Sequence, residues 1–87
     1  MDGFEPREYA IRAELAQLKD ARDFAVSAAV DFGLDEEALY NVRLAMSEAV
    51  TNAIRHGSSS PEDLVRIVAL VEGDMLVFEV LDSGRFV

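Results

Sequence analysis

One long amphipathic stretch in the middle of the chain limits the possible folds more than any other feature. Apolar residues recur at helical spacing from Glu36 to His56, and the Asp35 side chain is placed to cap the first turn. About 21 residues at 1.5 Å each give a helix of roughly 30 Å, which crosses a whole small domain. Gly57 is expected to end this helix. Much of the helix must be buried.

Polar residues form a line within this predicted helix. Glu48, Asn52 and His56 recur at steps of four, which stacks them along one side. The surrounding residues are apolar over more than half of the circumference. A buried carboxylate or amide without a partner is costly, so a ligand, a metal ion or a hydrogen-bond network is expected beside this line.

The segments on either side of the long helix have clear periodicities. Residues 7–15 alternate between apolar and polar, which predicts a half-buried strand. Residues 18–32 have the apolar spacing of a helix, and Gly33 follows as its C-terminal cap. Residues 64–71 and 75–81 are apolar, β-branched runs separated by Glu-Gly-Asp, which predicts an antiparallel hairpin.

This order of elements predicts an α+β fold. The expected architecture is a two-layer α/β sandwich, β-α-α-β-β, in which a mixed sheet carries two helices on one face. Residues 1–6 are expected to form a loose N-terminal lead, and residues 7–87 a single domain.

The last predicted strand ends in a carboxylate. Alternation puts Asp82 on the same face as Phe78 and Val80. If that apolar face packs on the helices, Asp82 lies at the rim of the two layers. We expect it to be aimed at the region flanked by Glu48 and Asn52.

Charge and composition exclude several classes of function. Lys and Arg number 8 against 17 Asp and Glu, so the net charge of -9 repels nucleic acid and anionic membrane surfaces. The chain has no cysteine and no apolar run long enough to span a bilayer, so a cytoplasmic protein is expected. Because Lys19 is the only lysine, a polyanionic ligand such as a nucleotide would need a divalent cation.

The polar residues match three chemical requirements of a magnesium–nucleotide site. The amide oxygen of Asn52 can complete a Mg²⁺ shell shared with phosphate oxygens. The carboxylate of Glu48 can hold a metal-bound water or accept a proton from an attacking hydroxyl. In Asp82-Ser-Gly84, the aspartate can accept the amino hydrogens of a purine, and the glycine lets the base approach the backbone.

At these residues the sequence resembles the Bergerat-fold, or GHKL, ATPases with a histidine kinase-like ATPase domain. Within that group it is most similar to the anti-sigma factor serine/threonine kinases. The segment from Ala45 to His56 resembles the N box of the family, and Asp82 and Gly84 resemble the start of its G1 box. The resemblance runs from about Tyr9 to Gly84.

The resemblance implies a function and a role for each residue. It implies ATP and Mg²⁺ as cofactors, with Asn52 on the metal, Glu48 assisting phosphoryl transfer and His56 bordering the triphosphate. Asp82 would recognise the adenine amino group, with Gly84 beside it. The implied protein is a transferase that binds a bacterial sigma factor and phosphorylates a serine on an anti-anti-sigma protein, a partner switch that regulates transcription.

The sequence also departs from the family pattern. Phe86 stands where the G1 box usually has a second glycine, and the phosphate lid, the G2 box and further strands would lie beyond Val87. We therefore expect a truncated fold with weak or absent ATP turnover and an unpaired sheet edge that favours a homodimer or a partner strand. The competing functions are a non-catalytic partner-binding module with a degenerate ATPase fold and the ATP-binding part of a histidine kinase.

Each candidate residue also has a purely structural interpretation. Glu48 alone would be an exposed carboxylate paired with Arg55, and Asn52 alone would bond a loop backbone. His56 alone favours the role of a cation at a helix C-terminus, and Asp82 alone that of a turn cap. Taken together with the surrounding N-box residues, the candidate residues favour the nucleotide site, although the helix-end cation stays the favoured interpretation of His56 itself.

Overall fold

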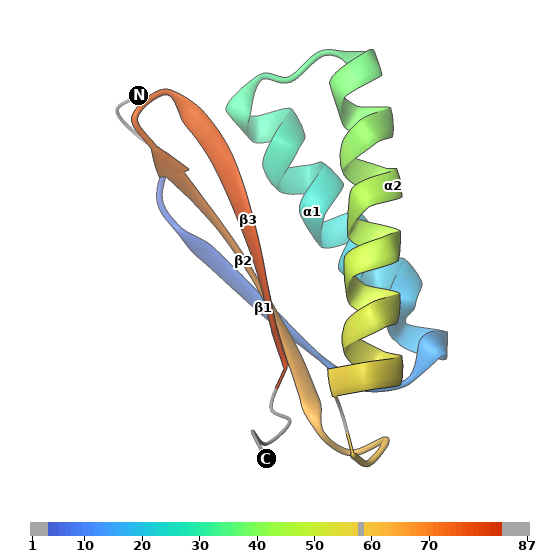
Figure 1. The fold of residues 1–87 in the computed structure, drawn as a ribbon. Helices are drawn as coiled ribbons and strands as arrows, with labels where there is room; N and C mark the ends of the chain where they lie inside the picture. Colours follow the sequence, from blue (N-terminus) through green and yellow to red (C-terminus); the bar gives the residue numbers. More distant parts are fainter. Residues whose placement is uncertain (1–3, 58, 83–87) are drawn as a thin grey trace.

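The computed structural model describes residues 4–57 and 59–82. The strands are β1 (Arg7–Arg12), β2 (Leu64–Glu72) and β3 (Met75–Asp82), and the helices are α1 (Leu18–Phe32) and α2 (Glu36–Asn52). A 3-10 turn, Leu15–Gln17, precedes α1, and a π-helical turn, Ala53–Gly57, follows α2. Both helices lie on one face of the sheet (Figure 1). The predicted two-layer α+β fold is confirmed.

The described sheet is antiparallel throughout, where a mixed sheet was expected. Its strand order is β1-β2-β3, and both neighbouring pairs run antiparallel. The reason is the helical hairpin: α1 leads away from the end of β1, and α2 returns the chain to that same end (Figure 1). There the backbone N–H of Ala13 donates to the carbonyl of Asp63 at 2.8 Å. β2 must therefore run back alongside β1.

The first strand is shorter than the sequence predicts. It ends at Arg12, and Leu15 lies in the 3-10 turn. The Gln17 side chain accepts a hydrogen bond from the backbone N–H of Arg12 at 2.9 Å, so this turn folds back on the strand end. The buried face of β1 continues beyond the end of the strand. Ile11 lies in the strand and Ala13 follows it, and both side chains are buried. The apolar alternation in the sequence therefore extends past Arg12.

The connection between the helices is built as the sequence predicts. Gly33 has a φ of 105°, and its N–H donates to the carbonyls of Ala29 and Val30. Glycine adopts this left-handed conformation without the steric cost of a Cβ. The Asp35 side chain accepts from the N–H of Ala38 at 2.9 Å, so it caps α2.

The end of α2 differs from the prediction. A regular helix was expected to run to His56 and to stop at Gly57, but the α-helical part ends at Asn52 and the chain continues as the π turn. Among the described residues, Gly33 and Gly73 are the glycines with a positive φ. Gly57 is therefore not a left-handed helix stop.

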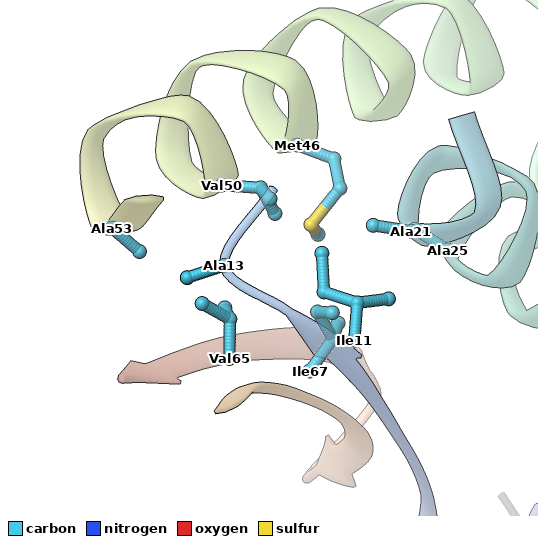
Figure 2. Close-up of a cluster of buried hydrophobic side chains, with 9 residues drawn as sticks. All are labelled: Ile11, Ala13, Ala21, Ala25, Met46, Val50, Ala53, Val65 and Ile67. Carbon is cyan, nitrogen blue, oxygen red and sulfur yellow. The ribbon is translucent and has the colours of Figure 1, made fainter. Parts of the chain in front are cut away.

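The core lies between the sheet and one side of each helix. In Figure 2, side chains of α2 and of the π turn face the sheet residues, with α1 alongside. The buried cluster comprises Ile11, Ala13, Ala21, Ala25, Met46, Val50, Ala53, Val65 and Ile67. Alanines make up the contribution of α1, so its backbone can approach the sheet closely.

The hairpin of β2 and β3 forms as predicted, with Gly73 and Asp74 between the paired residues Glu72 and Met75. Gly73 has a φ of 63°, the conformation that a two-residue hairpin turn requires. Phe78 and Val80 pack on the core. The predicted face of β3 is therefore confirmed.

Within the N-terminal lead, which was expected to be loose, Phe4 packs against α1, whereas Glu5 and Pro6 are exposed. The Phe4 ring meets the Phe32 ring edge to face, with centroids 5.7 Å apart. The Arg7 guanidinium lies 4.7 Å from the centre of the Phe4 ring and pairs with Asp31 at 2.7 Å. Aromatic and cation–π contacts thus hold this segment to the end of α1.

Candidate functional site

The line of polar residues on α2 lies on the exposed side of the helix. Glu48, Asn52 and His56 are all exposed, and the described residues include no buried polar side chain. The expectation of a buried carboxylate and amide is therefore wrong. Met46 and Val50 face the core, and a residue two positions later lies about 200° around the helix, on the opposite side.

The structural alternatives for Glu48 and Asn52 are not observed. The ion pairs of the described residues join Arg7 to Asp31, Lys19 to Asp23 and Arg66 to Glu8. Within that part of the chain, Glu48 forms no ion pair with Arg55, and the Asn52 amide makes no hydrogen bond to another protein group. Their oxygens are therefore accessible to a ligand from solvent.

Asp82 meets the end of the helical segment. A Cβ atom placed on Gly57 would lie 2.5 Å from Cγ and 3.2 Å from Cβ of Asp82, so the two residues are in close contact. Glu48 lies nine residues before Gly57, roughly 13 Å along the axis of a helix. The carboxylate of Asp82 thus reaches the last turn after Asn52 and not the position of Glu48. Gly84 lies outside the described residues.

The structure has a groove between α2 and β3 that was not predicted from the sequence. Its volume is about 300 Å³, and its lining is almost entirely apolar. Asn41, Val42, Ala45, Met46, Ala49, Phe78 and Val80 line it. Of the predicted site residues that the structure describes, none belongs to this lining. The feature of the sequence that could have indicated this groove is the pair Ala45 and Ala49. These residues lie one turn apart on α2, and their small side chains leave space beside the helix.

Two basic residues lie near the site, at the end of the helical segment. Arg55 and His56 lie in the last turn, where unpaired carbonyl groups carry partial negative charge. Lys19 and Asp23 form an ion pair one turn apart on the exposed side of α1. There the 2.8 Å hydrogen bond from Lys19 to Asp23 raises the pKa of Lys19 and lowers the pKa of Asp23.

The described part of the chain lacks two other kinds of feature. It contains no group of three or more histidine, aspartate or glutamate side chains placed to hold a metal ion. None of its helices is both long enough and apolar enough to cross a membrane.

Comparison with known proteins identifies the family. The sequence profile described as histidine kinase-like ATPase domain matches residues 11–86. The chain belongs to this ATPase family. The matched range includes the helix that carries Asn52 and the strand that ends at Asp82, so the resemblance inferred from those residues is confirmed at the level of the family.

Within the ATPase family, the chain is similar to several anti-sigma F factors. It is 41% identical over 64 residues to that of Clostridium acetobutylicum, a match covering 74% of this chain and 45% of that protein. The protein of Clostridium kluyveri is 46% identical over 55 residues, which is 63% of this chain and 37% of the relative. The chain thus spans less than half the length of these curated relatives.

A relative with a different name is also similar. The gliding motility regulatory protein of Myxococcus xanthus is 37% identical over 65 residues, which covers 63% of this chain and 8% of that protein. The histidine kinase-like ATPase domain thus occurs in proteins of very different length. Family membership alone does not select among their functions.

Proposed function

We propose that this chain is the nucleotide-binding portion of an anti-sigma factor type serine/threonine kinase. Residues 7–87 form the N-terminal portion of its ATPase domain, and residues 1–6 a short lead. Family membership and the similarity to anti-sigma F factors support this assignment. The ligand would be an adenine nucleotide, ATP for kinase activity, bound with Mg²⁺.

The observation that carries this proposal is the contact between Asp82 and Gly57. It brings the end of β3 to the last turn of the helix that carries Asn52, although the two segments are far apart in sequence. The carboxylate proposed to recognise the base and the amide proposed to bind the metal ion therefore belong to the same end of the domain. The apolar groove between α2 and β3 adds a surface against which an aromatic base can pack.

The exposed residues of α2 fit the remaining roles. The Asn52 amide would bind Mg²⁺ together with phosphate oxygens, which is the usual arrangement when a protein contributes few ligands of its own. Glu48 would accept the proton of the attacking serine hydroxyl, and His56 would border the phosphates. Bound ATP would supply the phosphoryl group. Gly84 would let the base approach the backbone beside Asp82.

In this role the protein would work in the cytoplasm on two protein partners. One is a sigma factor that it holds inactive, and the other is an anti-anti-sigma protein that it phosphorylates on serine. The names of the curated relatives support the sigma-factor side of this assignment. Binding of nucleotide would set which partner is held.

The proposal is tested by calorimetric titration with ADP and ATP, with and without Mg²⁺. Asn52→Ala should weaken Mg²⁺-dependent binding about tenfold or more, because it removes the proposed metal ligand and the loss of even an outer-shell partner costs about 10–100-fold in metal affinity. Glu37→Ala is the control, because Glu37 is exposed at the start of the same helix and does not line the groove. Asp82→Asn should weaken adenine binding, and Asp74→Asn should not. Absence of Mg²⁺-dependent binding, or equal effects of the controls, would favour the non-catalytic partner-binding module.

We further propose that two copies pair through β3 to form a homodimer. Among the described strands β3 is at the edge of the sheet, and Met75 and Leu81 are 65% and 40% exposed. An antiparallel pairing centred on Phe78 would set Met75 opposite Leu81 of the second copy and Val77 opposite Glu79. This register pairs Met75 with Leu81 and keeps the two copies of Glu79 from lying directly opposite each other.

Light scattering after size exclusion tests the dimer. Val77→Lys places a charge at the sheet edge and should shift the chain toward monomer. Leu64→Lys changes an exposed apolar residue near the start of β2 and serves as the control. A monomer at all concentrations, or equal dissociation by the two substitutions, would contradict the β3 interface.

A further inference from the structure

The glycine at position 57 is not explained by its backbone conformation. It lies inside the π turn, and its φ is not positive, so other residues can adopt the same conformation. Alanine is a better helix former than glycine at such a position. At Gly33 and Gly73, in contrast, the backbone conformation explains the glycine. Both have a positive φ, and a Cβ on either residue would meet nothing within 4 Å.

What excludes a side chain at Gly57 is Asp82. The three atoms nearest to a Cβ placed there all belong to Asp82, with Oδ2 the closest, Cγ at 2.5 Å and Cβ at 3.2 Å. To restore an ordinary contact of 3.4 Å, Cγ would have to move by about 0.9 Å. Asp82 is exposed, so its carboxylate can move without displacing a core side chain. A side chain at position 57 would therefore displace the carboxylate without disturbing the core.

We propose that Gly57 is a positioning residue that determines base specificity, because its missing side chain gives the Asp82 carboxylate its place at the end of the helical segment. This inference rests on the proposed function. A carboxylate accepts hydrogen bonds and therefore favours the amino group that adenine carries where guanine carries a carbonyl oxygen. Hydrogen bonds tolerate little change in length, so a shift of the carboxylate weakens this discrimination.

The test compares Gly57→Ala with Gly33→Ala. Titrations with ADP and with GDP, both with Mg²⁺, give the affinity and the ratio of the two dissociation constants. Gly57→Ala should weaken ADP binding about tenfold, lower the ADP preference by a similar factor, and leave the melting temperature equal or higher. Gly33→Ala should lower the melting temperature and leave both affinities unchanged, because it strains the backbone far from Asp82.

A double-mutant cycle shows whether Gly57 acts through Asp82. In the Asp82→Ala background, Gly57→Ala should cause no further loss of ADP affinity. Additive losses, or a Gly57→Ala variant with the affinity and selectivity of the original chain, would overturn the inference and leave the proposed function intact. A chain that binds no nucleotide would instead refute the proposed function and, with it, the role in base recognition. A structure of Gly57→Ala in which Asp82 keeps its place would overturn the inference without any ligand.

Discussion

The packing of α2 on the sheet can be tested by removing two methyl groups from Val50. This side chain is fully buried, with 0% of its surface exposed, and it packs in the cluster with Val65 and Ile67. The position lies two residues before Asn52, so it anchors the turn from which the candidate site projects. Val50→Ala shortens the buried side chain without introducing a polar group. The expected result is a less stable domain with the same fold.

The change in the free energy of unfolding is the loss of packing in the core, partly offset by a gain in helix propensity. Two buried methyl groups contribute about 1.6 kcal/mol at roughly 0.8 kcal/mol each. The cavity left behind adds to this loss, since the surroundings relax only partially. Alanine then returns up to about 0.7 kcal/mol through its higher helix propensity. We expect a net loss of about 2 kcal/mol, which would lower the melting temperature of a domain of this size by about 8–16 °C.

Val30→Ala is the matched control for this measurement. Val30 also lies in a helix, but 53% of its surface is exposed. It gains the same helix propensity on substitution and loses little buried area, so its stability should stay equal or rise slightly. Urea unfolding followed by circular dichroism gives both free energies, provided that the slope with denaturant is unchanged. Equal effects of the two substitutions would refute the assignment of Val50 to the core.

Three further predictions concern local features. Asp35→Ala removes the hydrogen bond to the Ala38 N–H and should cost about 1 kcal/mol in urea unfolding. Gly73→Ala forces a residue with a side chain to a φ of 63° and should cost about 1 kcal/mol, whereas Gly73→Asn should cost less. Lys19→Met should raise the pKa of Asp23 in an NMR titration, because the hydrogen bond that lowers this pKa is lost. Since the pKa of Asp23 is lowered by folding, any stability from the pair is present above the unfolded pKa and disappears as the pH falls through the folded value.

The fold was largely predictable because its determinants are local in sequence. Period-two alternation gave the exposed and buried faces of β3, and apolar spacing gave the limits of α1. Gly33 and Asp35 each act through atoms three or four residues away, so sequence alone could assign their roles. The antiparallel pairing of β1 with β2 was not predicted, because the direction of β2 relative to β1 depends on where the helical hairpin delivers the chain.

The environment of the site was less predictable, because helix α2 is apolar over more than half of its circumference. Leu44 is 51% exposed and Ala45 is also exposed, whereas Met46 is buried, although all three residues are apolar. Periodicity therefore could not say which side meets the sheet. Contact with Ile67 and its neighbours selects the side of Met46, and this choice leaves Asn52 in solvent. The groove between α2 and β3 follows from the same choice.

The position of Asp82 depends on the hairpin turn at the far end of β3. The turn pairs Glu72 with Met75, and from there the register sets Asp82 opposite Val65, on the face that packs against the helices. A slip of one residue would exchange the two faces of the strand. Leu81 would then lie where Asp82 now meets Gly57, and a hydrocarbon side chain would replace the carboxylate. The chemistry proposed for the end of the sheet is therefore fixed by backbone geometry at Gly73, at the opposite end of the strand.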